Sequence, residues 1–496
     1  MNKKYLIAII AILIIMICIA AFSLINSNAS GGGEISIDAN ALEDRGNLVV
    51  DSQSLDETNG NYHTDNADEN TILIKNNGAL KLANSIINKT GDTASTGDDA
   101  DFYGINSAVL VNTNGTLDIS NVEIKTSSKG SNGIFVTNAD ASQTEESSSA
   151  GGQPPEAQGS SDGGQPPEAM GGEGGSPPDE NGGGQPGETT VEGTTQATVK
   201  NVKITTHSDK SRGLDATYNG IINAENVVIN TDGQSCAALA TDRGEGQVHV
   251  KNSEINTGVS KKSGRGSPLI YSTGNITVEK TKGTAHVSQI ACIEGKNSIE
   301  LMDCDLTGYA QGNRQDEGQY VDLGGIFIYQ SMSGDADVGT STFAAKNSKL
   351  SIADDSPDAG EAPMFHITNT ACVINLEKTE FNYKSGVFLE SSGQNQWGNE
   401  GSNGGVCQLN TADETIGGDI IVDSISSLDW NMKNTNFKGA VNSTGNSIVN
   451  VGEGSTWTLT GDSSLSGLEV SGNIEYGDYS LTVDGKTYTS SNPFRG

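Results

Sequence analysis

A phrase of thirteen residues recurs along this chain and constrains its fold more than any other feature. Each copy begins with a Gly or polar turn, continues with two alternating apolar residues and an Asn, and ends with one further apolar residue. Where no insertion intervenes, the copies lie roughly 25 residues apart, and internal periods of this size are typical of solenoids. The clear copies are NGALKLANSIINK at 77–89, NGTLDISNVEIKT at 114–126, TTQATVKNVKITT at 194–206, NGIINAENVVINT at 219–231 and EGQVHVKNSEINT at 245–257.

The Asn of each phrase is expected to mark the bend between two strands of a coil. Asn tolerates the left-handed backbone of a tight bend, and Asn side chains stacked in successive coils can hydrogen-bond along the rod. The residues at this position in all copies, looser copies included, form a column along the rod and predict about 11 coils. Its members are Asn84, Asn121, Asn201, Asn226, Asn252, Lys280, Asp303, Asn347, Lys378, Asn434 and Asp462.

The alternation of apolar and polar residues predicts short strands with one face turned toward a core. Hydrophobic residues make up only 34% of the chain and Gly contributes 63 of its 496 residues. This composition is poor for a spherical core, but it suits the narrow column of side chains inside a solenoid. We therefore predict a single all-β domain, a single-stranded right-handed parallel β-helix. The net charge of -34 excludes a nucleic-acid partner, because nothing would neutralise the phosphates.

The N-terminus predicts a targeting segment at residues 1–29, helical if it spans a membrane. Lys3 and Lys4 precede an apolar run at 5–25. A secretory signal has an apolar region of about 7–15 residues, whereas about 20 are needed to cross a bilayer. The length favours a transmembrane anchor, with residues 5–25 in the cell membrane and the C-terminal domain outside the cell. A cleaved signal peptide, giving a secreted protein, is the alternative.

The rest of the chain divides by composition. Residues 30–69 are polar and turn-rich and are expected to form a stalk and an N-terminal cap. The β-helix is predicted for 70–476, with a C-terminal cap and tail at 477–496. Within it, 139–193 contains GGQPPEA twice and no Lys or Arg. A stretch without apolar anchors cannot offset its ordering entropy, so we expect a disordered acidic insertion there.

Several phrases resemble those of secreted right-handed β-helix proteins of the adhesin-like kind. They are ATDRGEG, GSPLIYSTGNI, IEGKNSI and STWTLTGDS, and the last continues as STWTLTGDSSLSGL, which is similar to β-helix proteins of the carbohydrate-binding, pectate-lyase-like kind. The resemblance covers roughly residues 69–485. It implies a cell-surface role and binding to a polysaccharide or to another cell surface. It carries over no catalytic residues.

The same kind of fold also hosts enzymes that cleave polysaccharides. A polygalacturonase-like site uses paired carboxylates with a Gly-His-Gly and an Arg-x-Lys, and this chain has neither motif. A Ca²⁺-dependent lyase needs an Arg beside a carboxylate cluster. Arg212, Arg243 and Arg265, with Asp215, Asp242 and Glu245 nearby, fit that pattern only loosely, because Arg–carboxylate pairs are usually structural. We therefore expect a non-enzymatic protein, with a structural envelope spacer as the alternative and a lyase as the least favoured one.

A glycan-binding strip is expected along the second strand phrase of several coils. Sugar recognition needs aromatic faces for stacking and carboxylates or amides for the hydroxyl groups. Alignment of these phrases on their closing Gly puts Thr241 and Tyr271 in one column. The candidate residues of the strip are Asp242, Arg243, Tyr271, Glu294 and Tyr329, and Trp397 in the loop NQWGNEG is the next candidate if this face does not bind. The competing interpretation is that Tyr271 and Tyr329 point inward as part of the core.

Two acidic loops are candidates for a structural Ca²⁺, because this cation prefers several oxygen ligands. Neither has the spacing of an EF-hand loop. The residues are Asp98, Asp99 and Asp101 in one loop and Asp354, Asp355 and Asp358 in the other.

Overall fold

The computed structural model describes residues 45–94, 97–139, 193–260, 266–311, 323–394 and 396–495. The predicted targeting segment at 1–29 and nearly all of the predicted insertion at 139–193 lie outside these residues. No helix in the described ranges is long and apolar enough to cross a membrane.

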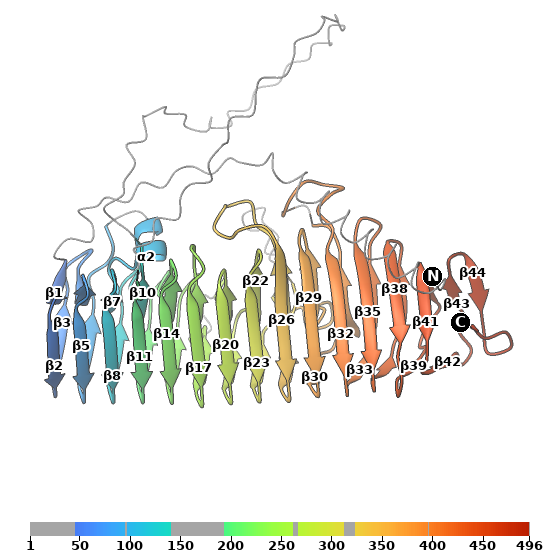
Figure 1. The fold of residues 1–496 in the computed structure, drawn as a ribbon, viewed down its shortest axis with the longest axis horizontal. Helices are drawn as coiled ribbons and strands as arrows, with labels where there is room; N and C mark the ends of the chain where they lie inside the picture. The colour runs from blue at the N-terminus through green and yellow to red at the C-terminus, as the bar shows by residue number, and fades with distance from the viewer. Residues whose placement is uncertain are drawn as a thin grey trace, which may run out of the picture.

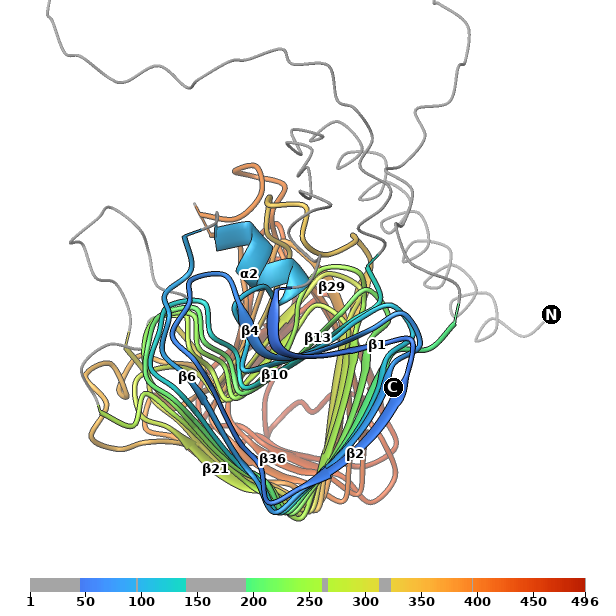
Figure 2. The same ribbon diagram turned by 90° about the vertical axis from the view of Figure 1, so that its left-hand side faces the viewer.

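The chain coils into a rod with three flat sides, each built from strands that pair in parallel with the same side of the next coil (Figure 1). Two sides are continuous sheets of 16 and 14 strands, here called the first and second sheets. The third side is divided into a 10-stranded and a 4-stranded sheet. Viewed from the end that carries β1, the chain passes clockwise from the first sheet to the second and third as it recedes (Figure 2), so the coil is right-handed. The structure therefore confirms the predicted parallel β-helix.

The first sheet contains β1 (Gly46–Asp51), β4 (Asn70–Lys75), β7 (Val109–Val111), β10 (Ile134–Thr137), β13 (Leu214–Thr217), β16 (Leu239–Thr241), β19 (Ile270–Ser272), β22 (Ala291–Glu294), β25 (Ile326–Tyr329), β28 (Phe365–Thr368), β31 (Val387–Ser391), β34 (Asp419–Val422), β37 (Val441–Ser443), β40 (Ser463–Leu465), β43 (Leu481–Val483) and β44 (Lys486–Tyr488). The second sheet contains β2 (Ser54–Thr58), β5 (Ala79–Ala83), β8 (Thr116–Ser120), β11 (Gln196–Lys200), β14 (Ile221–Glu225), β17 (Gln247–Lys251), β20 (Asn275–Glu279), β23 (Ser298–Met302), β26 (Thr340–Lys346), β29 (Ala371–Glu377), β32 (Val406–Ala412), β35 (Ser427–Lys433), β38 (Asn446–Val451) and β41 (Gly467–Val470).

The third side begins with β3 (Asn61–Thr64), β6 (Ile86–Lys89), β9 (Glu123–Thr126), β12 (Lys203–Thr206), β15 (Val228–Thr231), β18 (Glu254–Thr257), β21 (Lys282–Ala285), β24 (Asp305–Gly308), β27 (Lys349–Ile352) and β30 (Glu380–Asn382). It continues with β33 (Thr415–Gly417), β36 (Asn436–Lys438), β39 (Thr456–Thr458) and β42 (Asn473–Glu475). A short helix, α2 (Gly97–Tyr103), interrupts the coils between β6 and β7.

The recurring phrase supplies one strand of the second sheet and one of the third in each coil. In β8, Leu117 and Ile119 are buried while Asp118 between them is exposed. Leu117 pairs in register with Ala197 of the next coil, and further apolar residues follow in the same row. Because a strand has a side-chain period of two, this register stacks every apolar position of the phrase into one continuous core.

The Asn column forms the bend between the second and third sides, as predicted. The backbone of Asn84, Asn121 and Asn201 is left-handed, with φ of 52°, 54° and 53°. The side chain of Asn121 donates to Asn84 at 3.3 Å, and that of Asn201 donates to Asn121 at 3.2 Å. One member was missed, because Asp413 has the same backbone (φ 56°), and Asp462 was assigned wrongly, because its backbone is not left-handed.

The coils begin earlier than the sequence indicates. The predicted cap at 30–69 contains β1, β2 and β3, and each of these strands pairs in register with the corresponding strand of the next coil. The apolar residues of this first coil are sparse, which hides the phrase. The second sheet thus has 14 strands, more than the eleven coils expected. At the opposite end β44 folds back antiparallel to β43.

Aromatic rings fill the core in the later coils. Phe365 meets Phe343 and Phe388 edge to face, with ring centres 5.5 and 5.4 Å apart. Trp430 and Trp457 are fully buried and flank Phe437. Two of the three tryptophans of the chain therefore belong to the scaffold.

The first sheet differs from the other two sides because its outer surface is covered. Helix α2 and several loops lie over it (Figure 2). Strands such as β13 and β25 are consequently buried at every position, inward and outward. Polar and aromatic residues can therefore be held in fixed positions on this side of the rod.

Candidate functional site

Three of the residues proposed for glycan binding, Tyr271, Glu294 and Tyr329, project from the outer face of the first sheet. One outward row runs through Asp215, Ala240, Tyr271, Cys292 and Phe327, each paired with the next. Glu294 and Tyr329 pair with each other one row further along the strands. Tyr271 and Tyr329 are absent from the main core cluster inside the coils. The alternative in which they point inward is therefore wrong.

The predicted column of Thr241 with Tyr271 is also wrong by one residue. Thr241 pairs with Ser272, and Ala240 pairs with Tyr271. The turn after β16 is longer than the turn after β19, so Gly274 corresponds in register to Gly246 rather than to Gly244. Neighbouring residues of a strand face opposite sides, so this misalignment by one residue placed an inward Thr in the same column as an outward Tyr.

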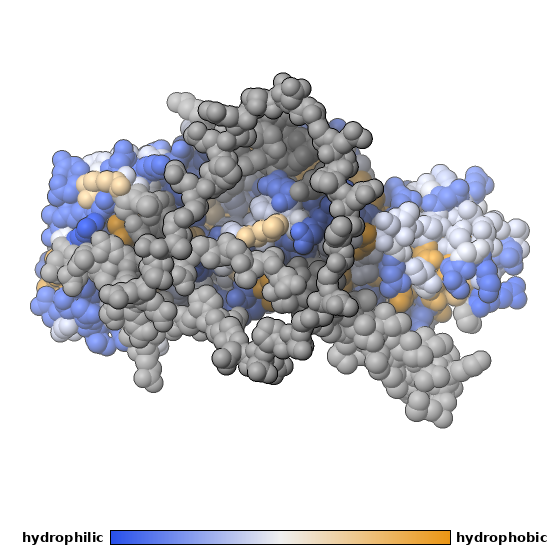
Figure 3. All heavy atoms as spheres, turned by 90° about the horizontal axis from the view of Figure 1, so that it is seen from above, coloured by the Kyte–Doolittle hydropathy of each residue, from blue (hydrophilic) through white to orange (hydrophobic). Residues whose placement is uncertain are grey.

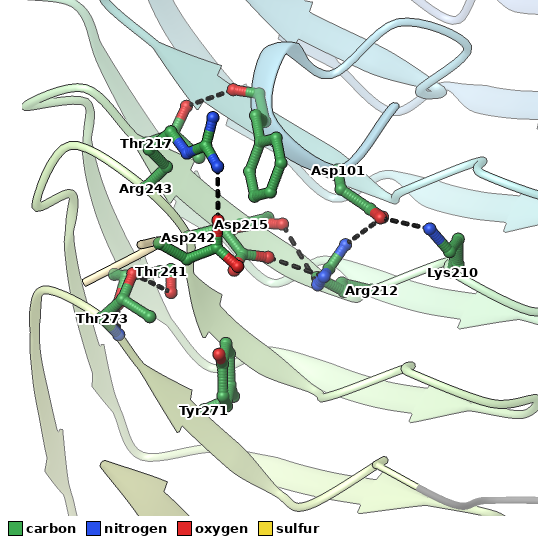
Figure 4. Close-up of polar contacts among 12 residues, drawn as sticks. Asp101, Lys210, Arg212, Asp215, Thr217, Thr241, Asp242, Arg243, Tyr271 and Thr273 are labelled. Atoms are coloured by element: carbon green, nitrogen blue, oxygen red, sulfur yellow. Dashed lines mark hydrogen bonds and ion pairs between the residues drawn. The ribbon is translucent and has the colours of Figure 1, made fainter. Parts of the chain in front are cut away.

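A buried cluster of charges lies on this face, over β13 and β16 (Figure 4). The guanidinium of Arg212 lies 2.8 Å from Asp101 and 2.6 Å from Asp242, and its Nε lies 3.5 Å from Asp215. Lys210 lies 2.6 Å from the second oxygen of Asp101. Arg212 comes from the turn before β13 and Asp101 from α2, so the cluster joins the helix to the sheet.

The three carboxylates outnumber the two cations of this cluster, and burial makes the imbalance costly. Asp215 is fully buried and Asp242 is 3% exposed. Burial raises the pKa of Asp242 to about 7 and that of Asp215 well above its usual range, although Arg212 opposes both shifts. The loss of water by itself lowers the pKa of Arg212, but the three carboxylates outweigh that effect and raise it. One of the acids is therefore expected to retain a proton near neutral pH.

Arg243 also holds helix α2 in place, through contacts other than those of Arg212. It pairs with Asp335, and its guanidinium carbon lies 4.1 Å from the centre of the Phe102 ring. The hydroxyl groups of Tyr103 and Tyr218 are 3.1 Å apart, and their rings stack. Arg243 is thus engaged in holding α2 and the Asp335 loop, while its side chain stays 22% exposed.

Aromatic residues gather on the same face in the following coils, at β19 and β25. Tyr329 stacks against Phe327 with ring centres 4.6 Å apart, and it lies 4.8 Å from Trp397 of the loop that follows β31. Tyr271 and Trp397 pack against this cluster and are partly exposed, whereas Tyr329 is buried. The four rings therefore lie together, and we call this group the aromatic cluster. Its members are Tyr271, Phe327, Tyr329 and Trp397.

A carboxylate is held among these rings. The hydroxyl of Tyr271 donates to Glu294 at 2.8 Å, and the hydroxyl of Ser331 donates to the other carboxylate oxygen. Glu294 is 2% exposed, and burial raises its pKa although both hydrogen bonds lower it. The Tyr271 hydroxyl is therefore oriented by Glu294, and Tyr271 as a whole is partly exposed.

The structure divides the six candidate residues between two clusters. Tyr271, Glu294, Tyr329 and Trp397 form one cluster, while Asp242 and Arg243 belong to the neighbouring charge cluster. Sequence analysis gave Asp101 only as a metal candidate, and it missed Ser331 and Asp335. Arg212 and Asp215 were noted only as an unspecific pattern, and their nearness to Asp242 was the one signal available.

The predicted Ca²⁺ loop at Asp98, Asp99 and Asp101 lies largely outside the described side chains, and the loop at Asp354, Asp355 and Asp358 forms no metal site with other described residues. The side chains of Asp98 and Asp99 lie outside that part of the structure, and Asp101 is committed to Lys210 and Arg212. In the other loop, Asp354 lies 3.9 Å from Lys384. No group of three or more His, Cys, Asp or Glu residues in the described ranges is placed to hold a metal ion.

Seen from above the first sheet (Figure 3), the described surface is mainly hydrophilic, with small hydrophobic patches showing between the loops.

A scan against protein-family models finds no match, and searches of curated proteins and of solved structures find none either. The geometry of this face is therefore the main indication of a function.

Proposed function

We propose that the protein is a non-enzymatic, polysaccharide-binding β-helix displayed at the cell surface. The observation that carries the proposal is the aromatic cluster, where the partly exposed rings of Tyr271 and Trp397 lie beside the oriented hydroxyl of Tyr271. Aromatic faces stack on the apolar faces of sugar rings, and a fixed hydroxyl gives direction to the sugar hydroxyl groups.

The state of the carboxylates supports binding rather than catalysis. Glu294 accepts hydrogen bonds on both oxygens and is buried, and Asp242 is paired with Arg212 beneath α2. A catalytic acid or base must reach the proton that it transfers. These carboxyl groups instead hold side chains and loops in place, as positioning residues do.

The apolar run at 5–25 and the acidic composition of the chain support the proposed location outside the cell. A rigid rod of 14 coils, roughly 60 Å long at about 4.8 Å for each coil, would hold the aromatic cluster away from the membrane. The same rigidity suits a structural spacer, which is the alternative if no glycan binds.

Replacing Trp397 with Ala tests the proposal. Loss of the stacking surface should weaken binding of the glycan found on an array by at least about tenfold, which corresponds to about 1.4 kcal/mol. Tyr479→Ala is the matched control, because Tyr479 is 40% exposed and lies near the far end of the rod. This control should bind as the wild type does, and both variants should melt near the wild-type temperature.

Equal binding by wild type and Trp397→Ala would contradict the aromatic site. Failure of the wild type to bind any glycan of the array would favour the spacer. Release of reducing or unsaturated sugar ends from a bound polysaccharide would instead show an enzyme.

A further inference from the structure

A groove runs along the outer face of the second sheet, on a different side of the rod from the aromatic cluster. Figure 1 looks onto this sheet, and no described loop lies over its strands. The hollow has a volume of about 420 Å³ and crosses β23, β26, β29, β32 and β35. Four spacings between five strands make it roughly 19 Å long at about 4.8 Å for each spacing.

Two parallel rows of side chains form the walls of this groove. One row contains Ala344, Asn375, Asn410 and Asn431, which are paired in register. The other contains Lys346, Glu377, Ala412 and Lys433, paired in the same way. The short side chains of Ala344 and Ala412 leave the walls low at those two positions.

The amides of the first row are linked to one another along the rod axis. Asn410 donates to Asn375 at 2.9 Å, and Asn431 donates to Asn410 at 3.2 Å. These two hydrogen bonds form a ladder of amides. The ladder uses one amide hydrogen of Asn410 and fixes the orientation of both its NH2 group and its carbonyl oxygen. All three amides are at least partly exposed, so a ligand in the groove meets oriented polar groups at the repeat of the coil.

The charges that line the groove balance. Lys346 lies 2.9 Å from Glu377, and Lys433 and Glu300 contribute one further charge of each sign. A uronate chain and a basic chain would each meet a repelling partner for every attracting one. The lining therefore favours an uncharged ligand with many hydroxyl groups.

The floor of the groove disfavours a peptide. A peptide that binds in extended form normally pairs its backbone with an open strand edge. Here the strands beneath the groove are already paired with each other in register from β23 to β35. Recognition is therefore left to side chains, which are the amides, the charged groups and apolar residues such as Ala344 and Ala412.

We propose that this amide groove is a second binding site, which takes an extended, uncharged polysaccharide lying along the rod axis. The inference shares only the class of ligand with the function proposed above. The two sites lie on different sheets, so each can be blocked without touching the other.

Ala412→Trp blocks the groove without removing any hydrogen bond of the ladder. Its matched control is Ala83→Trp, because Ala83 lies on the same row of the second sheet, in β5, outside the groove, and both residues are partly exposed. The probes are uncharged gluco-, manno- and galacto-hexasaccharides, with a galacturonate hexasaccharide as the charged comparison, titrated calorimetrically into the purified protein.

We expect at least one uncharged probe to bind, with a loss of at least tenfold in Ala412→Trp and none in Ala83→Trp. Asn410→Ala should also weaken binding, whereas Asn223→Ala, on the same row as Asn410 but in β14, should not. Preference for the galacturonate probe, no binding of any uncharged probe, or unchanged binding in Ala412→Trp would overturn the inference.

The Trp397→Ala variant separates this inference from the proposed function. Binding that survives Trp397→Ala but is lost in Ala412→Trp would place the glycan in the groove and not on the aromatic cluster. Binding that is lost in Trp397→Ala alone would leave the proposed function standing and refute the groove.

Discussion

Replacing Arg212 with Met is expected to lower the free energy of unfolding by about 3–5 kcal/mol at pH 7, because buried carboxylates lose their cation. Arg212 is 8% exposed and contacts Asp101, Asp215 and Asp242. Met has a similar length and no charge, so the loss reports the electrostatic role rather than a cavity. Denaturant unfolding of both proteins measures it.

The control for this experiment is Lys282→Met, which removes an exposed ion pair of similar distance. Lys282 lies 3.0 Å from Glu254, and its side chain is 70% exposed. Such pairs contribute about 0–1 kcal/mol. The Arg212→Met loss should shrink at pH 5, because burial raises the pKa values of Asp215 and Asp242 and both take up protons there. Adding Asp215→Asn and Asp242→Asn should restore part of the lost stability. A loss no larger than that of Lys282→Met would show that the cluster does not hold this face together.

Glu414→Gln is expected to stabilise the protein at pH 8 and to change little at pH 4. Glu414 occupies the inward position after the left-handed bend, where Thr379 and Thr435 stand in neighbouring coils, and it is 2% exposed. Burial raises the pKa of Glu414 from 4.5 to about 7, although the backbone N–H groups of Thr379 and Thr415 oppose the shift. One pKa unit corresponds to about 1.4 kcal/mol. The difference between the ordinary and the raised pKa therefore means that the ionised carboxyl group costs the folded state about 3 kcal/mol above pH 7.

The sign of this effect follows from proton binding. The folded protein holds the Glu414 proton more tightly than the unfolded chain does, so stability falls as the pH rises from about 4.5 to about 7. Gln has no such proton, and the pH dependence of its stability should be flatter over that interval. Comparison of the two curves cancels the contributions of Asp242 and Glu294, which both proteins share. Parallel curves would contradict the burial argument.

The repeat architecture was predictable because a short-range rule governs it. Each coil must bend, and Asn84 and its equivalents show the bend in the sequence, while residues such as Leu117 and Ile119 show the alternation. These signals need no knowledge of distant contacts. Where the signal weakens, as in β1 to β3, the prediction failed even though the strands pair as well as any others.

The candidate sites depend on contacts that the repeat does not encode. Asp101 reaches Arg212 across a separation of 111 residues, through a helix that interrupts the coils. The register of Tyr271 depends on the length of one turn, and a single residue decides which side of the sheet a side chain faces. The amide groove was likewise hidden, because Asn375 and Asn410 become neighbours only once the insertion between their coils is known.

The central claim, that a polysaccharide binds at the aromatic cluster, is tested most directly by the indole N–H signals in a proton–nitrogen NMR spectrum. The chain has three tryptophans, of which Trp430 and Trp457 are fully buried in the coils and Trp397 is partly exposed beside Tyr329. Titration with the glycan identified on the array should shift the Trp397 signal, assigned by its loss in Trp397→Ala, and leave the other two in place. An unchanged Trp397 signal at saturating glycan would contradict the proposed site.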